Sequence, residues 1–525
     1  MKRNMKLLAR VICLLIACLT VLALVVACDT NENNGPTYKD KTKDRHGRLK
    51  DSLPDMDEDP SNDYLINFNN EVINLMYWKD VEQPEFEQAE ITGDNVRDSI
   101  YERNVNVESR LSVDLNFIPV EVSYTVPTGS FLKHISAIYE AGEQEYDIIA
   151  THSRTQGTLA KYGYLYNIAA IEDSYINLEK PWWPAQLVET VSFGNNDYYF
   201  ISGDMSTNTL HQMHAVFFNK KMFEDLEKDI DDLYASVRGT NGKVWTLDML
   251  IELTSDVYED VDGDNVVSMG DRFGFTALHY VVDSFYTASN LRYIEDSNTD
   301  TLVISPNYGS AKTVKLVNKL GAWAATDAIW ITSHSTSTAD EKTAAREFFG
   351  QKQALFWMEH IATMHEETKD VKDLSYGIVP VPKYDAKQMN YYTGMGNPFS
   401  LYGIFADFDD RGDKQATLQM FSAVFECYAS EAYRLTTPEV FEVNMQLKYA
   451  ESQDETDMFE IVRLGVVFDL GKIFGEELDY MSEKPSTAIA ANASWSSTYK
   501  SYKTALEAKL KEIVANFEKY RERDQ

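Results

Sequence analysis

The segment from residue 260 to residue 271 carries oxygen-bearing groups at the spacing of a calcium-binding loop. A hard cation such as Ca²⁺ needs about six oxygen ligands that converge from a tight turn. Two departures weaken the match, because Asn265 stands where such loops have Gly and Asp271 is shorter than the usual Glu. An acidic surface turn is the alternative interpretation, and we expect a structural calcium ion. The expected ligands are Asp260, Asp262, Asp264, the Val266 carbonyl, Ser268 and Asp271.

A second chemical site lies near the N-terminus, where residues 1–27 have the pattern of an export signal: cationic residues followed by an apolar run. The run ends in Val25-Val26-Ala27-Cys28, which resembles the bacterial lipobox. This resemblance implies that Cys28 is lipidated and becomes the mature N-terminus, so palmitate or a similar acyl chain anchors the protein. An uncleaved membrane helix is the alternative. Either way, we expect the body on the extracellular face of the cell membrane.

The residues after Cys28 predict a tether. Residues 28–64 are rich in Asp, Asn, Lys and Pro and have few large apolar side chains, so they cannot bury a core and we expect them to be disordered. A flexible chain of this length reaches roughly 30–35 Å. Beyond it, Cys427 is the single remaining thiol, so no disulfide can form within the body. Its stability must come from a large core.

The net charge excludes one class of partner. The chain carries a formal charge of −34, and removal of the cationic signal makes the mature form more acidic. Such a surface repels the phosphate backbone, so we expect no nucleic-acid binding. Acidic side chains that keep an exported protein dispersed explain the charge most simply.

Alternating strand-like and helix-like patterns predict a parallel α/β sheet in the N-terminal part of the body. In such sheets ligands lie beyond the carboxyl ends of the strands. Trp78 and Asp80 follow the first strand and are therefore candidates for ligand contact. The expected elements are strands at 71–78, 113–120 and 146–150 and helices at 95–109 and 130–141.

Several motifs further along the chain occur in the order and spacing of one family. They resemble the extracellular solute-binding proteins of bacterial ABC importers, in the carbohydrate-type cluster called family 1. The resemblance implies a two-lobed α/β fold of the periplasmic-binding-protein type (type II), with a mixed sheet flanked by helices in each lobe and extra C-terminal helices. The motifs are Pro181-Trp-Trp-Pro184, Phe193 to Asp204, Ala215 to Phe223, Val244 to Asp248, Asp271 to Phe275, Phe348 to His360 and Gly377 to Tyr384.

The resemblance also implies how the chain divides between lobes. The two Gly residues of 391–399 suit the return crossing, because Gly permits sharp backbone bends. The expected boundaries are 1–27 for the signal, 28–64 for the tether, 65–209 and 391–445 for the first lobe, 210–390 for the second lobe, and 446–525 for C-terminal helices mainly on the second lobe.

Ligand residues are predicted from their placement at strand ends and crossings, and for 357–360 from the resemblance. Aromatic rings suit the apolar faces of a sugar, while its hydroxyls need polar partners. His360 is a further candidate implied by the resemblance, whereas His211 and His214 have a weak metal-like spacing and are expected to be hinge or core residues. The candidates are Trp78, Asp80, Trp182, Trp183, Asp204, Trp357, Glu359 and Trp495.

The resemblance implies a monomeric binding protein that hands a sugar or oligosaccharide to membrane permeases and has no catalytic residues. A surface-tethered glycoside hydrolase or lyase is one alternative, although Gly-x-Ser-x-Gly does not occur. A binding protein for a peptide or another polar solute is the other alternative. Apart from calcium, we expect no cofactor.

Overall fold

The computed structural model divides into two compact units, Met1–Ser52 and Leu53–Gln525, and the second unit is described below. The signal segment, Cys28 and most of the tether lie outside the described residues. Within the described part of the chain, no helix is both long and apolar enough to cross a membrane. The structure describes residues 43, 48–53, 66–122, 128–194, 196–268, 270–296, 301–332, 349–350, 353–368, 371, 374–408, 412–441 and 453–524.

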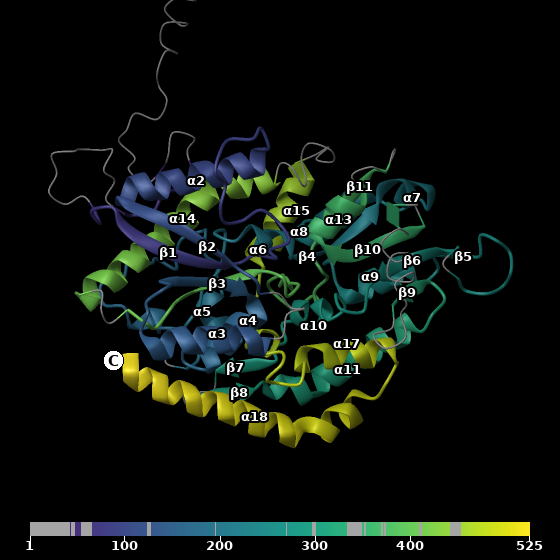
Figure 1. The fold of residues 1–525 in the computed structure, drawn as a ribbon. Helices are drawn as coiled ribbons and strands as arrows, with labels where there is room; N and C mark the ends of the chain where they lie inside the picture. Colours follow the sequence, from purple (N-terminus) through teal and green to yellow (C-terminus); the bar gives the residue numbers. More distant parts are fainter. Residues whose placement is uncertain are drawn as a thin grey trace, which may run out of the picture. The chain divides into compact units, whose positions relative to one another are not determined.

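The first sheet consists of β1 (Glu71–Trp78), β2 (Val113–Val120), β3 (Ile148–His152) and β12 (Ser400–Ile404). Its strand order is β12-β3-β1-β2 (Figure 1). Strand β1 is parallel to both β2 and β3, whereas β12 is antiparallel to β3. Every residue of β3 is buried, as expected for a strand covered on both faces. With its helices, this sheet forms the first lobe. These helices are α2 (Asn95–Leu111), α3 (Thr128–Ala141), α4 (Ser153–Lys161), α5 (Leu187–Val191) and α14 (Lys414–Phe441).

The second sheet consists of β4 (His214–Asn219), β5 (Tyr258–Glu259), β6 (Arg272–Ala277), β9 (Ile329–Ile331), β10 (Ala354–His360) and β11 (Tyr376–Val379). The order is β11-β4-β10-β6-β5, and β9 also pairs with β6. β10 is antiparallel to β4 and parallel to β6, so this sheet is mixed too. With its helices it forms the second lobe, on the right in Figure 1. These helices are α7 (Lys220–Asp225), α8 (Ile230–Arg238), α9 (Leu247–Thr254), α10 (Ser284–Ala288), α11 (Ala311–Ala324) and α13 (Ile361–Thr368).

Helix boundaries in both lobes follow local capping chemistry. The Asp94 carboxylate accepts a hydrogen bond from the backbone N–H of Arg97 at 2.9 Å and so begins α2. Asp229 caps α8 in the same way, and Gly239 ends that helix in the left-handed conformation with φ of 69°. Short polar residues therefore place the helix ends beside the sheets.

The remaining elements lie at the junction of the lobes or after α14. α15 contacts β11 and α8 of the second lobe, whereas α16 contacts α4 of the first lobe. α17 and α18 contact α11 of the second lobe, and α18 also contacts α4. The expected placement of the C-terminal helices mainly on the second lobe stays a prediction. These elements are α6 (Thr207–His211), β7 (Ile294–Asp296), β8 (Leu302–Ile304), η1 (Ile168–Ala170), η2 (Pro306–Gly309), α15 (Gln453–Leu464), α16 (Leu470–Ile473), η5 (Met481–Glu483), α17 (Lys484–Ala490) and α18 (Trp495–Asp524).

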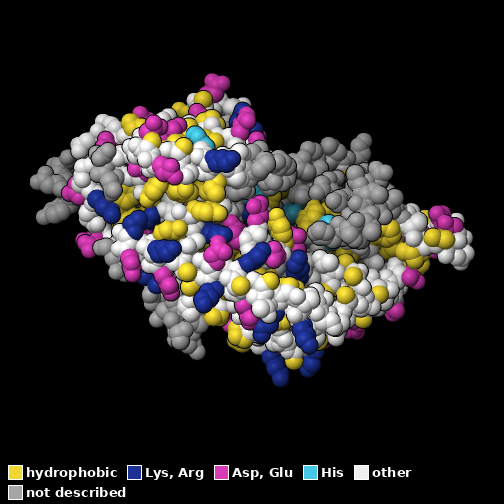
Figure 2. Space-filling view, turned by 60° about the horizontal axis from the view of Figure 1, so that its bottom comes forward, with side chains coloured by type: hydrophobic (Ala, Val, Ile, Leu, Met, Phe, Trp, Pro, Cys, Tyr) yellow, Lys and Arg dark blue, Asp and Glu magenta, His cyan; other side chains and the backbone are white. Residues whose placement is uncertain are grey.

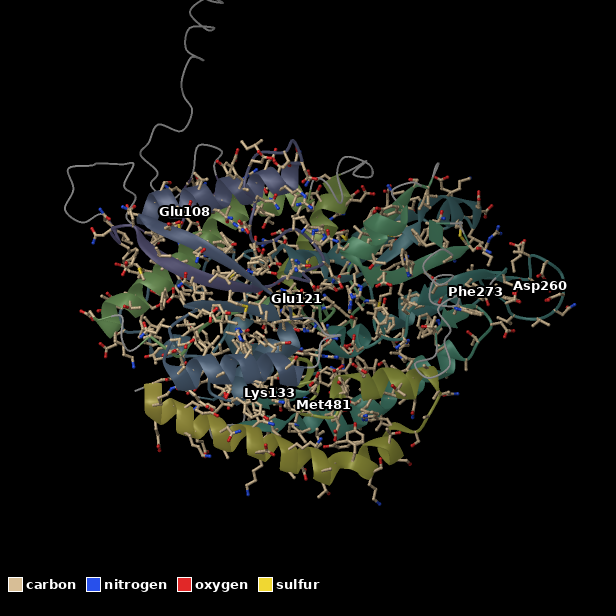
Figure 3. All side chains as sticks on the ribbon, viewed as in Figure 1. Glu108, Glu121, Lys133, Asp260, Phe273 and Met481 are labelled. Atoms are coloured by element: carbon tan, nitrogen blue, oxygen red, sulfur yellow. The ribbon has the colours of Figure 1, made fainter. Side chains whose placement is uncertain are left out.

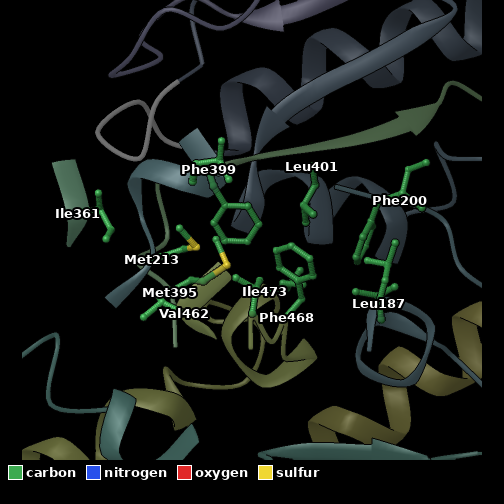
Figure 4. Packing of buried hydrophobic residues seen from close by; sticks show 14 of the residues in the cluster. Leu187, Phe200, Met213, Ile361, Met395, Phe399, Leu401, Val462, Phe468 and Ile473 are labelled. Atoms are coloured by element: carbon green, nitrogen blue, oxygen red, sulfur yellow. The ribbon is translucent and has the colours of Figure 1, made fainter. Parts of the chain in front are cut away.

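Three segments of the chain cross between the sheets and are hydrogen-bonded to one another. The first and second crossings meet at an antiparallel bridge between Met213 and Met395. The second and third meet at a parallel bridge between Thr393 and Val466, where the Thr393 N–H donates to the Gly465 carbonyl at 2.7 Å. Apolar side chains pack around the crossings, as Figure 4 shows for Met213, Met395, Phe399, Val462 and Phe468.

The predicted α/β architecture is confirmed, with mixed sheets flanked by helices. The expected strands at 71–78 and 113–120 match β1 and β2 at both ends. The pattern from Phe348 to Thr363 is that of a helix that leads into a strand, but this interpretation is wrong, because residues 354–360 form strand β10 and helix α13 follows it. Periodicity cannot separate these two structures when every position is buried.

A buried ion pair joins the first crossing to α15. Arg463 donates from Nη1 to Asp204 Oδ1 at 3.0 Å, and the Thr437 hydroxyl donates to the other carboxylate oxygen at 2.9 Å. Burial raises the pKa of Asp204, and the positive charge of Arg463 opposes this effect. The carboxylate therefore depends on one cation.

Replacement of Arg463 by Ala should destabilise the protein strongly, because it leaves a buried carboxylate without its cation. We expect a loss of about 3–5 kcal/mol in urea unfolding at neutral pH, and a smaller loss in acid, where Asp204 takes up a proton. Arg238, which pairs with Asp454 and Asp457 at the surface, is the matched control, and Arg238→Ala should cost under about 1 kcal/mol. Equal costs for the two substitutions would contradict the interpretation.

Candidate functional site

Two predicted ligand residues follow each other at the carboxyl end of β1. Trp78 is fully buried, its indole N–H donates to the Ser400 hydroxyl at 2.9 Å, and its ring contacts His152 edge to face at 5.5 Å. Asp80 is exposed in the turn that follows. Trp78 thus lies inside the first lobe, next to the end of β3, while Asp80 faces solvent.

The Pro181–Pro184 tryptophans lie within the first lobe. The Trp183 indole N–H donates to Glu426 Oε2 at 3.0 Å, and Trp182 packs against Tyr433 with ring centroids 5.9 Å apart. Both partners belong to α14. Together with the hydrogen bond from the Thr437 hydroxyl to Asp204, these contacts anchor the first crossing to α14.

The other two tryptophans are also buried away from the junction of the lobes. Trp357 is in the middle of β10 and packs against Phe217 and Phe349 within the second lobe. The Trp495 indole N–H donates to the Tyr308 carbonyl at 2.7 Å, at the start of α18. The structure therefore does not bring the predicted tryptophans together.

Glu359, in contrast, lies beside several other polar side chains where β4 and β10 meet the crossings. We call this group the hinge cluster. Its residues come from the first crossing, β4, β10 and the segment before α10, and three of the five were not among the predicted ligand residues. The hinge cluster consists of Gln212, His214, Asp283, Glu359 and His360.

Strand pairing places the two histidines side by side. His214 and His360 occupy the same register position on antiparallel strands β4 and β10, and their ring centroids are 4.5 Å apart. His360 Nδ1 lies 2.7 Å from Glu359 Oε1, which also accepts the backbone N–H of His360 at 2.9 Å. His214 Nδ1 is hydrogen-bonded to the Ser284 hydroxyl. In both rings Nδ1 is engaged.

One polar atom of each side chain in the hinge cluster is buried and has no hydrogen-bond partner within the described residues. Buried polar atoms are usually paired in folded proteins, so five such atoms gathered in one cluster suit a bound polar ligand or ordered water. They are Gln212 Oε1, His214 Nε2, Asp283 Oδ1, Glu359 Oε2 and His360 Nε2.

Gly396 of the second crossing lies against the hinge cluster. A Cβ atom at this position would be 2.2 Å from Gln212 Oε1 and 2.5 Å from His360 Nε2. Both unpartnered atoms thus face the same point of the crossing backbone. Only Gly allows this approach, which explains one of the two glycines in the return crossing.

Charged and aromatic groups border the hinge cluster. Lys472, from α16, donates to Asp283 Oδ2 at 2.6 Å and to the Met395 carbonyl at 2.5 Å. The Tyr280 ring stacks on His360 with centroids 5.8 Å apart. Glu82, which follows β1 in the first lobe, accepts the Gln212 side-chain N–H at 3.0 Å. The cluster is therefore connected to both lobes.

The protonation states of the side chains in the hinge cluster also leave free atoms that accept hydrogen bonds. Burial, together with the nearby His360 and Lys472, holds the pKa of His214 well below its ordinary value, so His214 is neutral at physiological pH. Gln212 Oε1 and the free oxygens of Asp283 and Glu359 accept hydrogen bonds when the carboxyl groups are ionised. A complementary ligand must therefore bring hydrogen-bond donors.

No family model and no curated protein matches the sequence. Among solved structures, UspC of Mycobacterium tuberculosis matches with 11% identity and a TM-score of 0.50, over 83% of this chain and 100% of that one. The chain has the two-lobed fold of periplasmic binding proteins. At this identity the similarity concerns the fold alone.

Two further structures align over similar lengths. UgpB of Mycobacterium tuberculosis, solved in complex with glycerophosphocholine, has 11% identity and a TM-score of 0.49, over 83% of this chain and 98% of that one. An extracellular solute-binding protein of Staphylococcus aureus, in complex with maltose, has 12% identity and a TM-score of 0.48, over 85% and 98%. Glycerophosphocholine and maltose are the solutes bound in those two structures.

The loop at residues 260–271 forms a separate acidic site at the end of the second lobe (Figure 3). The carboxylates of Asp260, Asp262 and Asp264 have oxygens within 4.8 Å of one another, which suits a hard cation. Asn265 has φ of 59° and thus adopts the conformation that usually requires Gly. Asp271 is buried and accepts from the Ser268 N–H at 2.8 Å and the Tyr258 hydroxyl at 3.1 Å. Calcium binding stays a prediction, with three carboxylates gathered and Asp271 engaged by the loop itself.

Calcium should stabilise the protein if this loop binds it, because the ion bridges carboxylates that otherwise repel. At 100 times its dissociation constant the ion should add about 2.7 kcal/mol, seen as a rise in melting temperature that EDTA reverses. The double substitution Asp262→Asn and Asp264→Asn should abolish the rise, whereas Asp256→Asn, at an exposed position before the loop, should preserve it. A melting temperature that does not respond to calcium or EDTA would refute the prediction.

Proposed function

We propose that this protein is a lipid-anchored extracellular solute-binding protein that captures a sugar or oligosaccharide by lobe closure and delivers it to the permease of an ABC importer. The observation that carries the proposal is the hinge cluster. In a two-lobed fold, it supplies five buried polar atoms at the junction of the lobes that have no partner within the described part of the chain. Ligands of such folds bind where domains meet.

The chemistry of the hinge cluster favours a polyhydroxylated solute. Its free atoms are predominantly acceptors, and each sugar hydroxyl supplies a donor that satisfies one of them. The Tyr280 ring, which stacks on His360, offers an aromatic face to the apolar C–H groups of a sugar. An additional anionic group on the solute would meet the Asp283 and Glu359 carboxylates, so neutral sugars fit better than acidic ones.

Lobe closure provides the mechanism of capture. A solute stabilises the closed state only through contacts that differ between the open and closed states. Glu82 from the first lobe and His360 from the second both reach the hinge cluster, so a solute held there contacts both lobes at once. Closure excludes water and strengthens each polar contact with the solute.

The side chains around the hinge cluster support binding without catalysis. Ser284 is fully buried and its hydroxyl contacts His214 Nδ1, while His214 Nε2 has no carboxylate partner among the described residues. A buried Ser–His pair without an orienting carboxylate on the other ring nitrogen is not a complete hydrolytic triad. A hydrolase therefore remains only as an outcome of the solute test.

The lipid anchor holds the binding protein at the membrane, where the permeases are. A tether of residues 28–64 that reaches roughly 30–35 Å keeps the body near membrane-embedded permeases. The resulting effective concentration favours repeated delivery without a strong protein–protein interface. A monomer suffices for this role.

Solute binding should appear as thermal stabilisation of the full-length protein. A sugar or oligosaccharide at 100 times its dissociation constant should add about 2.7 kcal/mol of stability. The screen should contain neutral sugars, maltodextrins, acidic sugars and short peptides. Stabilisation by a peptide alone would support the alternative solute class, and release of reducing ends would show a hydrolase and overturn the proposal.

Variants of the hinge cluster should separate binding from folding. His360→Ala and Gln212→Ala each remove a contact with the solute, and each should weaken affinity by roughly 10-fold, the equivalent of about 1.4 kcal/mol. The matched control is His134→Ala on α3, where the ring contacts Tyr146 in the first lobe. Equal affinity in all three variants would exclude the hinge cluster as the solute site.

Replacement of Cys28 by Ser should release the protein from membranes, because the lipid can no longer be attached. Fractionation should then find the variant outside the membrane pellet, and Cys18→Ser, within the signal segment, should remain in the pellet. Retention of Cys28→Ser in the membrane would indicate an uncleaved membrane helix instead.

A further inference from the structure

The C-terminal helix α18 contacts both lobes. It runs along one face of the molecule beneath the first and second lobes (Figure 1), and Figure 2 turns this face toward the viewer. With 30 residues and a rise of about 1.5 Å per residue, it spans roughly 45 Å. Such a helix can act as a rigid link between the two lobes.

The N-terminal half of α18 is fixed to the second lobe through Tyr308. The Trp495 indole N–H donates to the Tyr308 carbonyl at 2.7 Å, and the hydroxyls of Tyr308 and Tyr502 are 2.6 Å apart. Tyr308 precedes α11, whose Trp323 packs on Phe275 of β6. This end is therefore joined to the second sheet by fully buried aromatic rings.

The last two turns of α18 are fixed to the first lobe. The Tyr520 hydroxyl donates to the Lys161 carbonyl at 3.0 Å, and Arg523 Nη2 donates to the Leu165 carbonyl at 2.9 Å. Asp524 Oδ2 accepts the backbone N–H of Asn167 at 3.0 Å. An ion pair between Arg521 and Asp197 and the packing of Phe517 on Phe193 complete the contact.

A change of the angle between the lobes conflicts with these two attachments. The helix cannot stretch, so rotation about the crossings must either bend it or detach one end. At the first end Trp495 and Tyr308 are both fully buried. At the second end Phe517 is the buried ring, while Tyr520 and Arg523 are half-buried and attach through hydrogen bonds to backbone carbonyls. Half-buried polar contacts open more readily than buried aromatic packing, so the second end releases at lower cost.

We propose that α18 is a strap that holds the lobes at the angle seen here, at which the hinge cluster is buried, and that its last two turns are the releasable end. Opening of the lobes then requires detachment of residues 517–524 from the first lobe. The strap sets the population of the closed state before any solute is present. Its effect on solute affinity rests on the proposed function, whereas its effect on the lobe angle does not.

The lobe angle can be measured directly by pulsed electron paramagnetic resonance with one nitroxide label on each lobe. Lys133 on α3 (Figure 3) and Glu252 on α9 are exposed and suit replacement by Cys. The experiment uses the full-length chain with Ser in place of the three cysteines of residues 1–28. Cys427 can stay unchanged, because it is buried and escapes labelling.

The strap is tested by the double substitution Tyr520→Phe and Arg523→Ala. This variant removes the hydrogen bonds to the Lys161, Gly163 and Leu165 carbonyls. We expect the label distances of the solute-free protein to broaden and shift toward an open population. Glu522→Ala, at an exposed position on the same turn, should leave the distances unchanged.

Deletion of residues 517–525 provides a second and larger release of the strap. Circular dichroism must show that each variant is folded, and the double substitution carries the test if the deletion variant is not. For a closed fraction that falls to between about one third and one tenth, the apparent dissociation constant of a solute should rise roughly three- to ten-fold. Label distances like those of the unaltered strap in a folded variant overturn the proposal, whichever solutes bind.

Discussion

Backbone hydrogen bonds among three crossing segments hold the two sheets in a fixed relation. The His214 N–H donates to the Gly394 carbonyl and the Gly396 N–H donates to the Gln212 carbonyl, so the first and second crossings pair like strands. The third crossing adds its bonds to Thr393. Because these bonds fix the backbones of the crossings against one another, the side chains at the crossings are brought to defined positions. The hinge cluster, the buried ion pair of Asp204 and the position of α16 all depend on this pairing.

Much of the fold could be predicted from the sequence, because the residues that determine its strands and helices are close together in the chain. Apolar runs and helical spacing mark β1, α2 and β2, and the residues that decide them lie within a few positions of each other. Motif order indicated two lobes and a return crossing. In contrast, an element whose residues are all buried, such as β10, carries no periodicity, and its conformation depends on strands β4 and β6 beside it.

The candidate site was less accessible, because side-chain orientation depends on partners distant in the chain. Trp183 is held by Glu426, 243 residues away, and nothing near Trp183 indicates that its indole faces α14. Large aromatic side chains gain most from burial, so a Trp near a crossing is often part of the core. Asp283 and Lys472 come from segments without a motif and meet only after both lobes have formed. Glu359 and His360 were found because they end a strand that motif order had already placed.

The contact between Asn167 and Asp524 also bears on the order in which the protein folds. The two residues are 357 positions apart, and β12, the edge strand of the first sheet, is likewise made late in the chain. The second sheet, from β4 to β11, is continuous in sequence and has most of its partners nearby. Contacts of large sequence separation form slowly, because a long loop must first close. The second lobe can therefore fold first as a nucleus, whereas the first lobe is completed only after its late residues have been synthesised. Until then, β3 has an unpaired edge.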